Sequence, residues 1–220
     1  MNHSMTKVFS RVFALCAVLS LLALPAMAQE KAAKEPEWQS LFDGKTLKGW
    51  KQADFAGGGV VEVDKGTLHV GMGESLSGLT FTNKVPETNF EVEVEGKKIQ
   101  GSDFFCALTF PVGKEHCTFV MGGWGGAVVG ISSLDQMDAS ENETTKYMKF
   151  EKDHWYKIRV RVTTKKIEAW IDEEKLADVE LEGKKVSMRP GDIEQNVPFG
   201  IATYQTESAF KSIKIRTLAK

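Results

Sequence analysis

The chain has 220 residues, of which 28 are basic and 30 are acidic, and its formal net charge is −2 at pH 7. This slightly acidic balance argues against nucleic acid or an anionic membrane surface as the partner, because both attract basic proteins. The length suits one domain, large enough to bury about 70% of its unfolded surface.

Residues 1–28 are typical of a secretory signal peptide. Lys7 and Arg11 precede an apolar run over residues 12–24, and the sequence AMA at 26–28 supplies small residues at both cleavage subsites. The apolar run is too short to span a bilayer comfortably. We therefore expect cleavage after this sequence, no membrane span in the mature protein, and a periplasmic or extracellular location. An uncleaved anchor is the alternative.

The remaining 29–220 carry a net charge of −4, and their patterning is that of a β protein. Residues 29–37 are small and charged and are predicted to form a tether, followed by one domain over 38–220. Short alternating runs separated by turn signals, without a long 3.6-residue period, predict an all-β jelly-roll sandwich of two antiparallel sheets. The runs occupy residues 61–63, 68–70, 79–81, 90–94, 155–162, 167–171, 176–179, 199–203 and 210–215.

The three carboxylates of Glu91, Glu93 and Glu95 alternate with valines and point to one side of a predicted strand. Neighbouring carboxylates on such a face come near the spacing of roughly 5–5.5 Å that a retaining glycosidase pair requires. The alternative is a solvated strand face whose like charges deter edge pairing. We favour the solvated face, because acidic residues are mostly exposed.

Two cysteines remain after the leader, Cys106 and Cys117, within CALTFPVGKEHC. The sequence PVG at 111–113 is typical of a hairpin turn, and pairing about it places the two cysteines opposite one another. An oxidising compartment favours a disulfide, which would contribute roughly 3 kcal/mol on the chain-entropy model. Two buried free thiols that behave as small hydrophobic side chains are the alternative.

Trp124 lies between two glycine pairs in FVMGGWGGAVVG, residues 119–130. Because glycine lets a ligand approach closely, the ring is a candidate substrate-binding platform on which a sugar stacks. The alternative is a glycine-rich bulge that tucks the ring into the core. The apolar residues 127–129 favour the core, and the acidic loop that follows favours a site.

That loop, residues 132–153, is a long irregular segment, and connections of this length are usually functional or mobile. Asp135, Asp138, Glu141 and Glu143 supply hard oxygen ligands of the kind that bind calcium. Their spacing matches no EF-hand, and a soluble acidic loop is the alternative. Calcium is therefore the one possible ion, and no other metal or cofactor is predicted.

The opening phrase WQSLFDGKTLKGW, residues 38–50, resembles the start of the 3-keto-disaccharide hydrolase domain family. Later runs look like strands of the same family: HWYKIRV at 154–160, KIEAWID at 166–172, and a closing pair within 200–215. The resemblance implies a concanavalin A-like sandwich in an exported protein that cleaves or binds oxidised glycosides.

The middle of the chain departs from the family pattern. The family carries N-S-G-I and then E-x-Q-x-x-D, whose polar groups line the concave site. The matching residues here are GSDFF at 101–105 and CTFVMGGW at 117–124. We therefore transfer no catalytic residue from that motif, since fold alone does not establish function.

Three side chains are candidate catalytic bases: His116, Asp135 and Asp138. A 3-keto group acidifies the adjacent C–H bond, so a base could drive elimination of the leaving sugar. His116 titrates near neutral pH and lies on the hairpin that leads to the glycine-flanked tryptophan, although a lone histidine is more often structural. Gln205 and Glu141 are further candidates for substrate binding, through amide and carboxylate contacts to sugar hydroxyls.

Three hypotheses follow from these observations. The leading one is an enzyme that acts on 3-keto-glycosides, and the second is a carbohydrate-binding module that keeps the fold without catalysis. The third is a structural envelope protein. Turnover separates the first from the second, and saturable sugar binding separates the second from the third.

Overall fold

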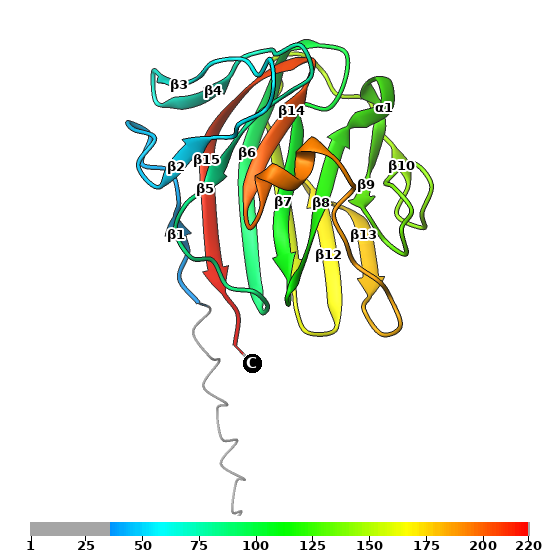
Figure 1. Ribbon diagram of the computed structural model, residues 1–220. Helices are drawn as coiled ribbons and strands as arrows, with labels where there is room; N and C mark the ends of the chain where they lie inside the picture. The colour runs from blue at the N-terminus through cyan, green and yellow to red at the C-terminus, as the bar shows by residue number, and fades with distance from the viewer. Residues whose placement is uncertain (1–35, 220) are drawn as a thin grey trace, which may run out of the picture. The chain divides into compact units, whose positions relative to one another are not determined.

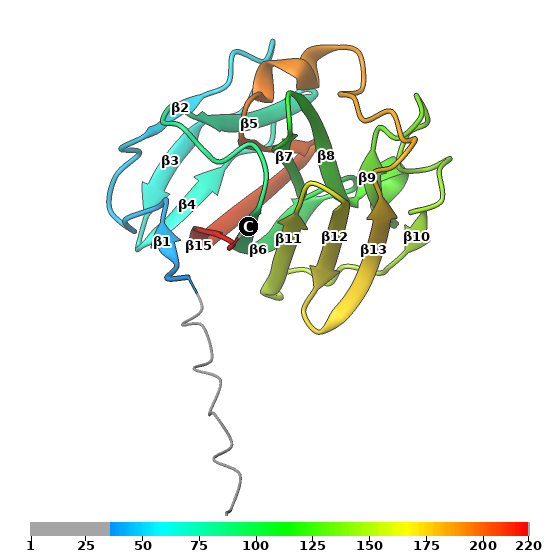
Figure 2. The same cartoon turned by 90° about the horizontal axis from the view of Figure 1, so that it is seen from below.

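The computed structural model describes residues 36–219, which form two antiparallel β-sheets packed on each other (Figures 1 and 2). The expected all-β sandwich is confirmed. The predicted signal peptide and residues 29–35 of the predicted tether lie outside the described residues. Within residues 36–219, no helix is long and apolar enough to cross a membrane.

The first sheet contains eight of the described strands, and the two longest lie side by side near its middle. Its order is β13 (Glu174–Glu180), β12 (Lys166–Ile171), β11 (Tyr156–Val162), β6 (Phe90–Gly101), β15 (Thr206–Thr217), β4 (Thr67–Val70) and β3 (Val61–Asp64), with β1 (Gln39–Ser40) paired to β15.

The second sheet contains seven of the described strands. Its order is β10 (Lys146–Tyr147), β9 (Val128–Ser132), β8 (Glu115–Gly122), β7 (Cys106–Val112), β14 (Gly200–Tyr204), β5 (Leu76–Phe81) and β2 (Trp50–Gln52). The short turn α1 (Gly123–Gly126) joins β8 to β9, and the 3-10 helix η1 (Asp192–Asn196) precedes β14.

The segment 182–199, which contains η1, covers part of the second sheet. In Figure 2 this orange segment lies on the side of β5 and β7 that faces away from the first sheet. Ser187 pairs with Ser133 through two backbone hydrogen bonds, of 2.9 and 3.2 Å. Asn196, which is fully buried, lies within 3.5 Å of the Thr80 hydroxyl of β5. These contacts hold the segment against the outer face of the second sheet.

The main core lies between the sheets, where alternation directs one face of each strand inward. Gly96 leaves room for the Phe210 ring, since a Cβ at this glycine would lie 2.7 Å from the ring carbon Cε1. A smaller apolar cluster includes Leu76, Ala107 and Val120, against which Ile193 of η1 packs. Six phenylalanines of the main core are fully buried: Phe90, Phe105, Phe110, Phe119, Phe199 and Phe210.

The family-like opening phrase closes one side of the sandwich. The Trp50 indole N–H donates to the Leu41 carbonyl at 2.8 Å, and Leu41 N–H donates to Ile213 of β15 at 2.8 Å. The Trp50 ring packs on Phe81, with ring centroids 4.9 Å apart. Asp43 accepts hydrogen bonds from the side chain and backbone of Thr46, which lower the pKa of its carboxyl to about 2. Residues of this opening phrase therefore have a structural role.

The expectation that the two cysteines lie opposite one another is wrong. In the β7–β8 hairpin, Cys106 lies opposite Met121 and Cys117 lies opposite Phe110. The turn consists of Gly113 and the following lysine rather than PVG, because the glycine takes a φ of +66° at the first turn position. Pro111 stays within β7, since β14 pairs with β7 only as far as Thr109 and leaves no ladder bond for a proline to break.

Both thiols are free and buried, and burial raises the pKa of each. We expect iodoacetamide to leave both unmodified in the folded protein and to alkylate both after unfolding without a reductant. Mass spectrometry of the intact protein measures this directly. A protein that accepts the two labels only after reduction would contradict the structure.

Candidate functional site

A cavity of about 540 Å³ lies on the outer face of the second sheet. Strands β5, β7, β8, β9 and β14 form its floor, and residues 189–193 form one wall. Its volume lies within the range of about 300–1,000 Å³ that is usual for small-molecule sites. The aromatic and charged residues that line it are Phe104, Trp124, Tyr204, Asp103, Arg189 and Asp192.

Trp124 lies at the tip of the turn α1 and lines the cavity. Its backbone is left-handed, with φ 50° and ψ 51°, and Gly122, Gly125 and Gly126 also have positive φ values. The residue is 41% exposed, so the alternative in which the ring packs into the core is wrong. The glycines permit a tight turn that leaves the indole open to a ligand.

Arg189 faces the tryptophan from the segment 182–199. Its Cζ lies 5.7 Å from the centre of the Trp124 ring, and its Nε lies 3.5 Å from Asp138 Oδ2. Among the described residues, its terminal nitrogens make no hydrogen bond. Asp192 likewise lines the cavity, with no side-chain partner in the part of the chain that the structure describes. A planar donor and a carboxylate are thus available to hydroxyl groups of a ligand.

Asp138 lies just behind the cavity wall. Its Oδ1 accepts hydrogen bonds from the Ser132 hydroxyl at 3.0 Å and the Ser133 hydroxyl at 3.2 Å. Ser132 and Arg189 both line the cavity, so Asp138 contacts two of its lining residues without lining it itself. Of the three candidate bases, Asp138 is the one placed beside the cavity.

His116 and Asp135 do not line the cavity. His116 lies at the hairpin end of β8, whereas Trp124 follows the other end of that strand, and burial lowers the pKa of the histidine. Asp135 accepts hydrogen bonds from the backbone of Lys185 at 2.9 Å and from the Lys184 side chain at 3.2 Å, and these bonds lower the pKa of its carboxyl.

Two of the predicted substrate-binding residues also lie outside the cavity lining. Glu141 is exposed in the acidic loop. The Gln205 amide donates to the Glu74 carbonyl at 3.1 Å, directly after Tyr204, which does line the cavity. Of the predicted binding residues, Trp124 alone is among the lining residues.

Two carboxylates of the acidic loop are neutralised by a lysine of the segment 182–199. Lys184 forms ion pairs with Asp135 at 3.2 Å and with Glu143 at 2.7 Å. Asn142 is buried and donates to the Ile131 carbonyl at 2.7 Å, which ties the loop to β9. Over residues 36–219 no group of three acidic, histidine or cysteine side chains is arranged to hold a metal ion. Calcium binding stays a prediction.

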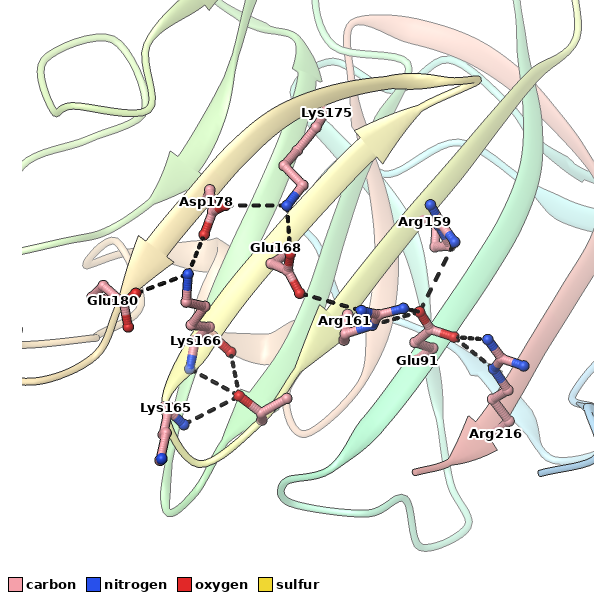
Figure 3. Close-up of polar contacts among 11 residues, drawn as sticks. Glu91, Arg159, Arg161, Lys165, Lys166, Glu168, Lys175, Asp178, Glu180 and Arg216 are labelled. Atoms are coloured by element: carbon pink, nitrogen blue, oxygen red, sulfur yellow. Dashed lines mark hydrogen bonds and ion pairs between the residues drawn. The ribbon is translucent and has the colours of Figure 1, made fainter. Parts of the chain in front are cut away.

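The acidic strand is not a solvated face, because its carboxylates are paired with basic side chains. Glu91 lies on the outer side of the first sheet and is fully buried, and Arg161 and Arg216 bind its two carboxylate oxygens (Figure 3). Glu93 and Glu95 form ion pairs of 2.8 Å with lysines of β15. Because β6 lies between β11 and β15, Glu91 meets basic side chains from both neighbouring strands.

Sequence reasoning missed Arg189, Asp192 and Asp103 as cavity residues. The first two belong to an irregular segment whose path over the sheet depends on the tertiary fold. Asp103 lies in the connection between β6 and β7, and no local pattern indicates that its carboxylate reaches a turn 22 residues later.

The two-layered antiparallel fold, with a cavity on the outer face of one sheet, defines a concanavalin A-like jelly-roll domain. The family described as the 3-keto-alpha-glucoside-1,2-lyase-like domain matches residues 37–216, and the chain belongs to this family. None of the curated proteins compared with the chain matches it.

Solved structures share the fold at low sequence identity. A candidate glycosyl hydrolase from Parabacteroides distasonis is 15% identical, with a TM-score of 0.53, over 83% of this chain and 94% of that one. The carbohydrate-binding module CBM66 from Bacillus subtilis is 11% identical, with a TM-score of 0.54, over 77% and 96%. The Crh5 transglycosylase in complex with NAG is 10% identical, with a TM-score of 0.56, over 85% and 88%. These likenesses establish the architecture.

Proposed function

We propose that this protein is exported and that it binds a glycoside in the cavity of the second sheet, with a pyranose ring stacked on Trp124. The observation that carries the proposal is the exposed indole in a cavity that also presents a guanidinium and a carboxylate. Stacking recognises the apolar face of a sugar, while Arg189 and Asp192 are placed to hold its hydroxyls. Family membership and a fold shared with a carbohydrate-binding module agree with this function.

Cleavage of a 3-keto-glycoside is the second candidate, favoured by the family and by carboxylates at the cavity. A base takes the proton from the carbon next to the keto group, the electron pair forms a C=C bond, and the bond to the leaving sugar breaks. The leaving oxygen then takes a proton. Asp138 is the best placed of the predicted bases, because it contacts Ser132 and Arg189 of the lining.

Titration of the purified protein with a 3-keto-disaccharide and its parent disaccharide tests both candidates. We expect a saturable change in tryptophan fluorescence, since Trp124 is exposed in the cavity. Chromatography of the same samples detects a released sugar. Binding without product supports a binding module, and product that is lost in Asp138→Asn supports cleavage. No saturable change with either sugar would overturn the proposal.

A further inference from the structure

The carboxylate of Asp103 links the body of the sandwich to the turn that carries Trp124. Its Oδ2 accepts a hydrogen bond from Gly125 N–H at 2.8 Å, and its Oδ1 accepts one from Phe104 N–H at 2.8 Å. We infer that Asp103 is a positioning residue that fixes the Trp124 ring in the cavity and so sets the affinity for a glycoside. This inference rests on the proposed function.

Asp103 is itself held firmly. Its backbone N–H donates to the Thr206 hydroxyl at 3.2 Å, and that hydroxyl donates to the Asp103 carbonyl at 3.0 Å. Thr206 is fully buried at the start of β15, and Tyr204 N–H donates to the Phe104 carbonyl at 3.1 Å. Residues 103 and 104 are thus clamped to the connection between β14 and β15. The backbone that carries the Asp103 carboxylate is therefore held in place.

The turn that it holds makes few hydrogen bonds through side chains. A non-glycine residue in the left-handed region is uncommon and persists only where surrounding contacts impose it. Glycines flank Trp124 on both sides, and they supply freedom but no side-chain contacts. Within the turn, Ala127 N–H donates to the Gly123 carbonyl at 3.2 Å. Among the described residues, the Asp103–Gly125 bond is thus the side-chain hydrogen bond that ties the tip of the turn to the cavity wall.

The turn also packs closely on the segment that carries Asp103. A Cβ at Gly126 would lie 3.0 Å from the Ser102 carbonyl oxygen. Both oxygens of Asp103 accept N–H bonds, and asparagine has only one acceptor oxygen. An asparagine at this position keeps one of the two bonds at most, so its effect should be intermediate between wild type and alanine.

The test compares Asp103→Ala and Asp103→Asn with wild type by calorimetric glycoside titration and by ¹⁹F NMR of 5-fluorotryptophan-labelled protein. The five tryptophans give five resonances, and loss of one in Trp124→Phe assigns that of Trp124. We expect about tenfold weaker binding in Asp103→Ala and a smaller loss in Asp103→Asn. In both variants the Trp124 resonance should shift or broaden while the other four stay unchanged.

Asp43→Ala is the matched control. It removes carboxylate bonds to the backbone of Lys45 and Thr46 in an exposed turn that does not line the cavity. It should leave both the glycoside affinity and the Trp124 resonance unchanged. If Asp103→Ala does not fold, the glycoside affinity and the Trp124 resonance of Asp103→Asn test the inference instead.

Wild-type affinity in Asp103→Ala, alongside weakened binding in Trp124→Ala, would overturn the inference. If wild type binds no glycoside at all, the proposed function fails instead. The ¹⁹F spectra then still decide the positioning role, because an unchanged Trp124 resonance in Asp103→Ala would overturn it and a shifted one would support it.

Discussion

Replacement of Glu91 by alanine should lower the free energy of unfolding by about 3–5 kcal/mol, the cost usual for removing one partner of a buried ion pair. The Glu91 side chain is fully buried between Arg161 and Arg216, with Nε–O distances of 2.7 and 2.5 Å (Figure 3). A third guanidinium, that of Arg159, lies 4.0 Å away. Urea unfolding followed by circular dichroism measures the loss.

Most of this loss of stability should come from the desolvated charge of Arg216. Its side chain is 11% exposed, whereas that of Arg161 is 35% exposed. Without Glu91, water reaches the more exposed Arg161 more readily than Arg216, so Arg216 keeps more of its desolvation cost.

Glu95→Ala is the control for this prediction. It removes a carboxylate from the same strand face, where the pair with Lys211 is more exposed, and should cost no more than about 1 kcal/mol. Equal losses in Glu91→Ala and Glu95→Ala would show that burial of Glu91 contributes nothing. The slope of the urea transition should be the same in both variants, because neither changes the surface exposed on unfolding.

The fold was predictable because alternation is a local property of each strand. Val92 and Val94 of β6 point inward, as their spacing indicates, and the same holds for Ile158 and Val160 of β11. The environment of Glu91 was not predictable in this way. Its partners are 70 and 125 residues further along the chain, and only the strand order brings them to it. The same alternation fits a solvated face and a buried ion pair.

The site was predictable only in part, for a similar reason. The glycine pairs around Trp124 indicate a special turn, and the turn forms. Arg189 reaches the ring from a segment more than 60 positions later, and such a loop carries no periodicity that would predict its path. The predicted hairpin register was wrong because of a local feature. The turn begins at Gly113 rather than Pro111, so the strands pair in another register and the two cysteines do not face each other.

Trp124→Ala should weaken glycoside binding by roughly 10–100-fold, which corresponds to about 1.4–2.8 kcal/mol. The ring is the large exposed aromatic surface of the cavity, and it lies beside the guanidinium of Arg189. Because Trp124 is already 41% exposed, the free energy of unfolding should change by no more than about 1 kcal/mol. Isothermal titration calorimetry is the suitable measurement, since the substitution itself alters the fluorescence.

Trp155→Ala is the matched control, because that ring lies outside the cavity, between Lys97 at 5.2 Å and Lys211 at 4.8 Å. It should leave the affinity unchanged. Equal losses of affinity in both variants would show that the effect of Trp124→Ala is not specific to the cavity. An unaltered affinity in Trp124→Ala would show that the ring is not part of the site.

The glycoside affinity of Trp124→Phe should lie between those of Trp124→Ala and wild type, since a smaller ring still offers an apolar face to a sugar. A graded series of this kind ties affinity to the area of the ring, which a purely structural role of the turn does not predict.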